Sequence, residues 1–246
     1  MLNTVYYDGP DATPLLIAHG LFGSARNWNV IAKRLSAARP VIVVDMRNHG
    51  SSSWFDSHSY FDMADDLAQV IDKPCDVLGH SMGGKAAMVL ASQHPELIRK
   101  LIVADIAPVA YSHTQNGPIE AMRRVDLGSI TSRAMAKEQL TGLEAGVPDF
   151  LLQSLDMKTK RWTLNLDVLA AEMAKIVGFP HIDTAFDGPA LFLSGALSDY
   201  VRTEHRPAIK ALFPKARFAK IPDTHHWLHA EKPREFQAAV EAFLGK

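Results

Sequence analysis

The fold is decided by the stretch Val77-Leu78-Gly79-His80-Ser81-Met82-Gly83-Gly84, which runs directly into the helix-forming segment 85–91. A short apolar run leads into a Gly-x-Ser-x-Gly turn, and this pattern presents a serine at the sharp corner between a strand and a helix. The flanking glycines let strand and helix approach, and the helix amides point toward any oxyanion formed there. A bare match also fits an ordinary small-residue turn. The preceding apolar strand and the alanine-rich helix favour a nucleophile at Ser81.

Strands and helices alternate on both sides of this turn. A short strand is expected at 3–8, apolar runs predict buried strands at 14–20 and 41–45, and further strands are expected at 76–79, 100–105, 189–195 and 216–221. Between and after them, helical patterns lie at 27–37, 62–71, 204–213 and 233–244. Such alternation is typical of an α/β fold with a mostly parallel sheet and helices on both faces.

The alternation stops in the middle of the chain. Residues 109–187 contain helical segments at 119–125, 132–140, 149–155 and 166–176 and no convincing strand. We therefore predict a core domain made of residues 1–108 and 188–246, with a helical cap (lid) at 109–187 inserted before the last two strands. We expect five large side chains of the cap mostly to pack within it, and some of them to line an apolar acyl pocket. They are Met122, Met135, Met157, Trp162 and Met173.

Composition excludes several function classes. The 246 residues carry a formal net charge of −1, which gives no reason to expect nucleic acid or an anionic membrane as a partner. The single cysteine, Cys75, excludes an internal disulfide and favours a reducing compartment. No apolar run approaches about 18 residues, and no basic segment followed by an apolar stretch opens the chain. We expect a cytoplasmic protein without stable membrane insertion.

Five phrases of the sequence carry a family resemblance. They are His19-Gly20-Leu21-Phe22-Gly23-Ser24, Asp45-Met46-Arg47-Asn48-His49-Gly50-Ser51, Gly79-His80-Ser81-Met82-Gly83-Gly84, Asp105-Ile106-Ala107-Pro108 and His226-Trp227-Leu228-His229-Ala230-Glu231-Lys232-Pro233. With them the chain resembles the α/β-hydrolase superfamily over nearly its full length, and within it the YbfF-type bacterial esterases and related abhydrolase-domain proteins. The resemblance implies an α/β-hydrolase fold. The N-terminal segment is shorter than the two full leading strands of larger members.

A serine hydroxyl becomes a good nucleophile only when a base within hydrogen-bond reach removes its proton. In this fold the base is a histidine in the loop after the final strand, which leaves His225, His226 and His229. The family places glycine-histidine before an aromatic residue here, and this implies that His226, just before Trp227, is the base. His225 then stands where the family has glycine.

Two carboxylates compete for the acid that orients the base. Most of the superfamily takes it from the turn after the strand that follows the cap, where this chain has Ser198 and then Asp199. The YbfF-type subgroup resembles instead a pattern in which the acid follows the strand after the nucleophile helix, which is Asp105 here. We expect Asp105 to orient His226. Ser198 is expected as an auxiliary hydrogen-bond partner, and Asp199 remains the alternative acid.

An oxyanion hole needs two backbone amides that face one point. One should come from Met82, the residue after the nucleophile, and the other from the loop after Gly20. We expect Leu21 to supply the second amide, with Phe22 as the alternative. Side chains expected to line the substrate pocket are Phe22, His80 and Trp227.

A polar cluster near the predicted site invites a different interpretation. Asp45, Arg47, Asn48 and His49 could suggest a metal site, but no second cluster of ligands has metal-like spacing. We expect this loop to support the floor of the active site, and His19 to hold the neighbouring loop by hydrogen bonding. Neither a metal nor a cofactor is expected.

The expected activity is that of a carboxylesterase-type serine hydrolase, which acts on esters of small to medium acyl groups through an acyl-enzyme. Acyl thioesters are a second candidate substrate, and the sequence does not indicate the oligomeric state. One rival keeps the fold and changes the reaction to carbon–carbon bond hydrolysis or to a lyase step like that of menaquinone-pathway relatives. Another rival is a non-catalytic ligand-binding member of the fold.

Overall fold

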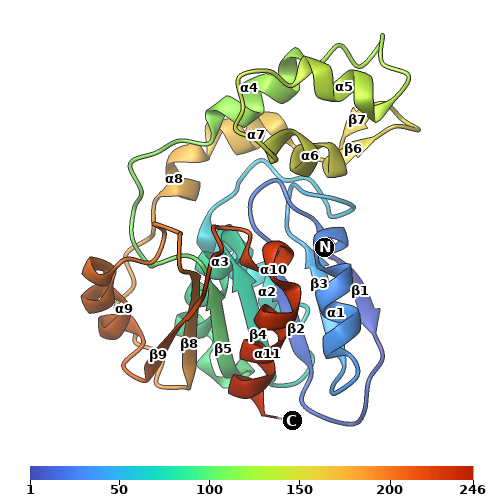
Figure 1. Ribbon diagram of the computed structural model, residues 1–246. Helices are drawn as coiled ribbons and strands as arrows, with labels where there is room; N and C mark the ends of the chain where they lie inside the picture. The colour runs from blue at the N-terminus through green and yellow to red at the C-terminus, as the bar shows by residue number, and fades with distance from the viewer. Residues whose placement is uncertain (246) are drawn as a thin grey trace.

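A computed structural model describes residues 1–245, and a seven-stranded sheet forms its centre (Figure 1). The strands are β1 (Asn3–Tyr7), β2 (Leu15–Ala18), β3 (Val41–Asp45), β4 (Cys75–His80), β5 (Ile98–Ala104), β8 (Ala190–Gly195) and β9 (Ala216–Ile221). Their order is β1-β3-β2-β4-β5-β8-β9, with β1 antiparallel to β3 and every other pair parallel. The continuous apolar runs occur because β2, β4 and β8 are buried along their whole length.

Helices cover both faces of the sheet, as predicted. Helices α1 (Asn29–Leu35) and α11 (Pro233–Leu244) pack on one face, and α2 (Tyr60–Ala68), α3 (Met82–Gln93) and α9 (Arg206–Leu212) pack on the other (Figure 1). Alternate side chains of β2 enter the two cores: Leu15 and Ile17 join the first, and Leu16 joins the second. Shorter pieces are η1 (Ala25–Trp28), η2 (Pro95–Leu97), η4 (Thr203–His205) and α10 (Leu228–Glu231).

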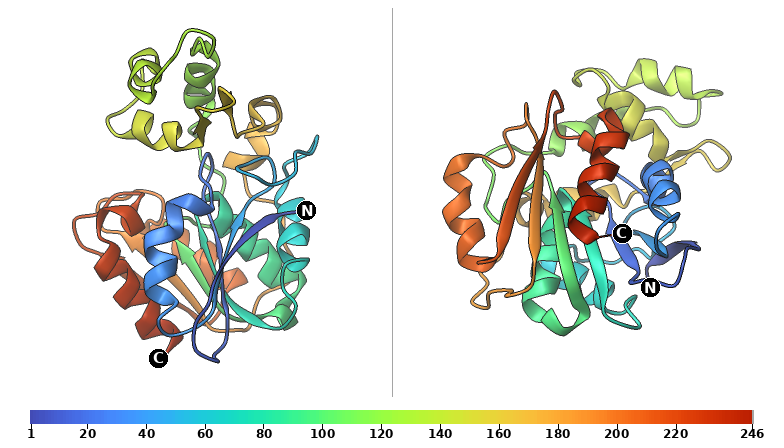
Figure 2. Two further views of the ribbon diagram at one scale, coloured as in Figure 1. Left: turned by 90° about the vertical axis from the view of Figure 1, so that its right-hand side faces the viewer. Right: turned by 60° about the horizontal axis from the view of Figure 1, so that its bottom comes forward.

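The segment between β5 and β8 lies over the carboxyl ends of the strands, and we call its residues 109–187 the cap (Figures 1 and 2). It contains α4 (Asn116–Arg124), α5 (Arg133–Gln139), α6 (Val147–Leu151), η3 (Leu152–Ser154), α7 (Leu166–Ala171) and α8 (Met173–Val177).

Two details of the cap differ from the sequence prediction. The expected helix at 166–176 is interrupted at Glu172, whose backbone lies at φ −93° and ψ 6°. A small antiparallel pair, β6 (Leu155–Asp156) and β7 (Arg161–Trp162), forms where no strand was expected. Strands of two residues are too short to show an alternating pattern, so the sequence carries no periodic signal for them.

The order of the strands in the sheet indicates where a ligand would bind. From β2 the chain goes to β3 on one side, and β4 then lies on the other side of β2. The loops that leave the carboxyl ends of β2 and β4 therefore diverge, and ligands bind in the crevice at such a switch point. Within residues 1–245, every helix is too short or too polar to cross a lipid bilayer.

Candidate active site

Ser81 lies at the sharp corner between β4 and α3. Its backbone has φ 53° and ψ −120°, a strained conformation for a residue with a side chain. The glycines permit this corner: a Cβ on Gly79 would lie 2.3 Å from the carbonyl oxygen of Gly83, and a Cβ on Gly83 would lie 2.5 Å from that of Ala18. The corner thus places the Ser81 hydroxyl at the N-terminus of α3, at the carboxyl end of the sheet.

His226 lies in the loop between β9 and α10 and contacts two of the predicted partners. Its Nε2 is 3.0 Å from Ser81 Oγ, and its Nδ1 is 2.8 Å from Asp105 Oδ2. An ionised carboxylate can only accept, so Nδ1 carries a proton, and Nε2 of the neutral ring accepts the hydroxyl hydrogen of Ser81. The ring of Tyr200 stacks on the imidazole with centroids 4.1 Å apart.

Asp105 follows β5 and is completely buried. Besides His226, its carboxylate accepts the amide of Gly195 at 3.1 Å and the hydroxyl of Ser198 at 2.5 Å. The side chain of Asp199 is exposed and forms no hydrogen bond or ion pair with any residue in 1–245. The structure therefore brings Asp105 to the imidazole and leaves the alternative acid in solvent. Ser198, expected as a second hydrogen-bond partner of the base, donates to the Asp105 carboxylate instead.

The loop after β2 lies against Ser81, because a Cβ on Gly20 would lie 3.1 Å from the Cβ of Ser81. The Gly20 carbonyl accepts hydrogen bonds from His19 Nδ1 at 2.8 Å and from the Gly23 amide at 3.0 Å. In a trans peptide the N–H points opposite to the C=O, so the Leu21 amide points away from both donors. It donates to no acceptor in the described part of the chain.

The amides of Met82 and Phe22, the other two candidates for the oxyanion hole, differ in whether they already have an acceptor. The amide of Met82 is the first of α3 and, within residues 1–245, has no acceptor, as is usual for the first turn of a helix. The amide of Phe22 already donates to Nε2 of His49 at 3.1 Å. Leu21 and Met82 are thus the amides available to an oxyanion, and Phe22 is not.

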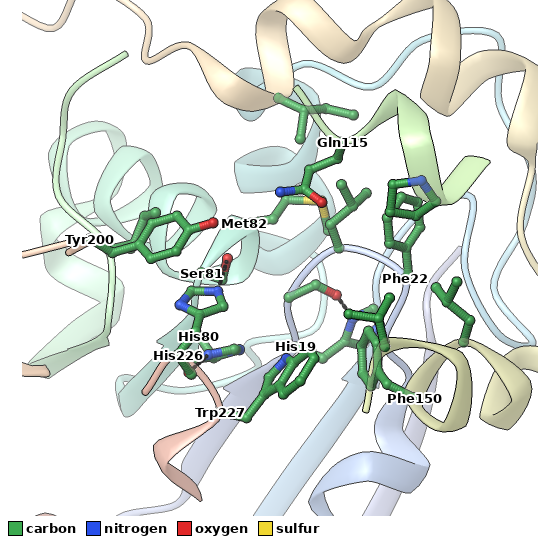
Figure 3. A pocket seen from close by; sticks show the side chains of 18 of the residues that line it. His19, Phe22, His80, Ser81, Met82, Gln115, Phe150, Tyr200, His226 and Trp227 are labelled. Carbon is green, nitrogen blue, oxygen red and sulfur yellow. Dashed lines mark hydrogen bonds between the residues drawn. The ribbon is translucent and has the colours of Figure 1, made fainter. Parts of the chain in front are cut away.

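A cavity of about 830 Å³ lies between the carboxyl end of the sheet and the cap (Figure 3). The predicted pocket residues Phe22, His80 and Trp227 line it, together with Leu21, Ser81, Met82 and His226. From the cap, its lining includes Tyr111, Gln115, Leu143, Val147, Phe150 and Ile176. The serine hydroxyl and the imidazole thus face a space that can hold a small molecule.

One expectation about the cap is wrong. The four cap methionines and Trp162 do not line the cavity. Met122 and Trp162 are buried inside the cap, where the indole Nε1–H donates to the Met122 carbonyl at 3.0 Å. Leucine, valine and phenylalanine side chains near α6 form the apolar wall instead.

Sequence reasoning missed the residues that brace the base. The Tyr111 hydroxyl accepts the amide of Ala107 at 2.9 Å and donates to the carbonyl of Tyr200 at 2.7 Å. His80 Nε2 is 2.9 Å from the carbonyl of His226, so this nitrogen carries the proton and donates. Burial lowers the pKa of His80 well below its usual value, which keeps the ring neutral. No motif marks the two tyrosines, since they meet only through the folded loops.

Lys85 is a second residue that the sequence did not single out. It lies in the first turn of α3, is buried, and lines the cavity. Its Nζ donates to the carbonyls of Val109 at 2.9 Å, Val177 at 3.0 Å and Gly178 at 2.5 Å. Burial lowers the pKa of this ammonium group to about 7. Because these carbonyls belong to the first and last parts of the cap, Lys85 attaches the cap to α3.

The sheet order, the serine corner and the histidine loop after the last strand define an α/β hydrolase. A family model described as alpha/beta hydrolase fold matches residues 13–233, and the chain belongs to this family. The prediction of a mostly parallel sheet flanked by helices is confirmed.

Three similar proteins align with this chain over nearly its whole length. Esterase YbfF of Escherichia coli (strain K12) is 40% identical over 242 residues, which cover 94% of this chain and 93% of the relative. The sn-1-specific diacylglycerol lipase ABHD11 of Mus musculus is 40% identical over 254 residues, covering 96% and 83%. A solved structure described as a marine microorganism esterase has a TM-score of 0.92 and 38% identity, covering 98% of both chains. The resemblance to YbfF-type esterases is thereby confirmed.

Proposed function

We propose that this chain is a serine hydrolase that cleaves carboxylic esters, and also acyl thioesters, through an acyl-enzyme intermediate. The observation that carries the proposal is the continuous hydrogen-bonded path from Ser81 through His226 to Asp105. Support comes from the relatives of similar length, two of which are named as an esterase and a lipase. A pocket protein without activity would need the cavity but not this path, which favours catalysis over the ligand-binding rival.

In the first half of the reaction, Ser81 Oγ attacks the ester carbonyl carbon while its proton passes to His226 Nε2. The carbonyl π electrons move to the oxygen, which the amides of Leu21 and Met82 stabilise. Asp105 holds the imidazole in the correct tautomer and stabilises the imidazolium. The bond to the leaving alcohol or thiol then breaks, and His226 returns the proton to that leaving group.

In the second half, a water molecule replaces the alcohol. His226 takes its proton as the water oxygen attacks the acyl carbon, and the same two amides stabilise the second oxyanion. The bond to Ser81 Oγ breaks, the proton returns to the serine, and a carboxylic acid leaves. The cavity of about 830 Å³ and its apolar cap wall favour small to medium acyl groups.

The direct test compares the wild-type chain with Ser81→Ala on p-nitrophenyl esters of increasing acyl length. We expect kcat to fall by about 10⁴-fold or more. Ser129→Ala is the matched control, because this exposed serine of the cap only donates to the carbonyl of Asp126. Undiminished turnover by Ser81→Ala would reject the proposal. Turnover of a diketone without any ester hydrolysis by the wild type would favour the carbon–carbon hydrolase instead.

A further inference from the structure

The loop that carries the proposed oxyanion donor contains a strained residue. Phe22 has φ 62°, in the left-handed region that disfavours any residue with a Cβ. Its side chain is buried and also lines the cavity. A backbone in this conformation persists only where its surroundings fix it. The contacts on the two sides of Phe22 therefore hold the peptide that adjoins the Leu21 amide, whose own peptide is held at the Gly20 carbonyl by His19 and the Gly23 amide.

On the amide side, the contact is an imidazole. The Phe22 N–H donates to Nε2 of His49 at 3.1 Å, and Nδ1 of His49 is 2.8 Å from the carbonyl of Arg47. A carbonyl can only accept, so Nδ1 carries the proton and Nε2 offers its lone pair. Burial, together with the nearby His19 and His58, lowers the pKa of His49 well below its usual value. The ring thus stays neutral and keeps accepting.

On the carbonyl side, the contact comes from the cap. The hydroxyl of Ser154, which is buried at the end of η3, donates to the Phe22 carbonyl at 2.9 Å. The carbonyl of Ser154 in turn accepts the amide of Thr163 at 2.8 Å. The Thr163 carbonyl accepts the amide of Gly50, the residue after His49, also at 2.8 Å. His49 and Ser154, which contact the two sides of Phe22, are therefore connected to each other through the backbone hydrogen bonds of Thr163 in the cap.

We propose that His49 and Ser154 are positioning residues that keep the Phe22 amide out of the oxyanion hole and the Leu21 amide in it. This inference rests on the proposed function, since it presumes an oxyanion at Leu21 and Met82. Without His49, the buried Phe22 N–H would lose its acceptor, and an unsatisfied buried donor is costly. The peptide would rotate toward another acceptor, and the adjoining Leu21 amide would move with it. Oxyanion donors act only over a narrow range of distance, so this displacement lowers the rate.

The test replaces His49 with side chains of similar volume that either lack or retain a hydrogen-bond acceptor for the Phe22 N–H. In His49→Leu we expect kcat on a p-nitrophenyl ester to fall about 10- to 100-fold, somewhat less than the loss of a whole oxyanion donor. KM should stay within about 3-fold, because the interaction acts in the transition state. In His49→Gln the side-chain oxygen can accept the same N–H, and kcat should return to within about 5-fold of wild type. An alkylboronic acid, which forms a tetrahedral adduct with the serine, should lose affinity for His49→Leu in proportion to kcat.

A second pair keeps the inference testable if His49→Leu does not fold. Ser154→Ala removes the hydroxyl on the carbonyl side, and we expect kcat to fall about 3- to 10-fold with KM nearly unchanged. Its matched control is Ser92→Ala, a buried serine whose hydroxyl donates to the Met88 carbonyl far along α3. This control should keep the wild-type kcat.

Several outcomes would overturn the inference. They are a wild-type kcat in folded His49→Leu, an equal loss in His49→Gln, a change confined to KM, or equal rates for Ser154→Ala and Ser92→Ala. A wild-type chain without ester turnover would refute the proposed function itself. An active wild type with an equally active His49→Leu variant would refute only the role of His49, so the two failures are distinguishable.

Discussion

The core side and the cap side of the cavity are built differently. On the core side, Ser81, His226 and Asp105 are joined by hydrogen bonds of 2.8 and 3.0 Å, and further partners fix the carboxylate. On the cap side, most of the side chains that line the wall near α6 are apolar, such as Val147 and Phe150. Hydrogen bonds fix direction, whereas apolar contacts select mainly by size. Under the proposed function, we therefore expect the core to determine the reaction and the cap to determine which acyl groups fit.

The largest effect should come from breaking the core side at its acid. In Asp105→Asn the amide cannot hold His226 in the required tautomer, and we expect kcat to fall about 10⁴-fold. Asp199→Asn is the control, because the exposed side chain of Asp199 does not contact the imidazole, and its kcat should stay within about 2-fold of wild type. Steady-state kinetics on one p-nitrophenyl ester decide between them. A greater loss in Asp199→Asn would show that the acid is misassigned.

Lys85 connects the core side to the cap side, and its contribution to the free energy of unfolding should depend on pH. Its pKa is about 7 in the folded chain, below the usual 10.5, so between these values the unfolded chain holds a proton that the folded chain has lost. The free energy of unfolding therefore rises with pH through this window. Relative to Lys85→Met, which cannot titrate, wild type should gain about 2 kcal/mol of stability from pH 7 to pH 9. Urea unfolding of both chains at the two pH values measures this difference, and parallel stabilities would contradict it.

The cap side can be changed without touching the core. Phe150→Ala enlarges the apolar wall, so longer acyl chains should fit better than short ones. We expect kcat/KM for esters about two carbons longer to rise roughly 5- to 10-fold relative to short esters. Met135→Ala serves as the control, because this cap methionine is partly exposed and does not line the cavity. If wild type and Phe150→Ala had the same dependence of kcat/KM on acyl-chain length, the cap wall at Phe150 would not select the substrate.

The smallest effect concerns the ring stacked on the base. Tyr200→Leu removes the aromatic face 4.1 Å from His226, and since such stacking contributes about 0.5–1.5 kcal/mol, kcat should fall roughly 2- to 10-fold. Tyr200→Phe keeps the face and loses only a hydroxyl that contacts His113 at 3.1 Å, so it should stay near wild type. Equal rates for the leucine and phenylalanine variants would show that stacking does not hold the imidazole.

Much of the fold could be predicted because its signals are local. A parallel strand covered on both faces reads as a continuous apolar run, and β3 (Val41–Asp45) occurs at the predicted residues. The partly exposed edge strand β9 (Ala216–Ile221) and α11 (Pro233–Leu244) also occur where they were predicted. The cap was harder. Its helices are short, Glu172 interrupts one of them, and the β6–β7 pair has no periodic pattern.

The candidate site shows the same division between local and long-range information. Ser81, His226 and Asp105 follow strand ends, and the carboxyl ends of parallel strands lie at one edge of a sheet, where side chains can meet. The choice of His226, and of Asp105 over Asp199, came from the family resemblance. The walls and braces depend on contacts between distant loops. Lys85, for example, meets Val177 across 92 positions of sequence. Such packing leaves no short motif, and the expectation that some of the cap methionines line the cavity was therefore wrong.

The most direct test of the account is covalent labelling with a fluorophosphonate, followed by intact-mass measurement and peptide mapping. Attack by an activated serine expels fluoride and leaves one phosphonyl group on the attacking oxygen. We expect a single adduct on Ser81 in the wild-type chain, none in Ser81→Ala, and much slower labelling in His226→Ala. An adduct on another residue, or equal labelling of wild type and Ser81→Ala, would contradict the assignment of Ser81 as the activated nucleophile.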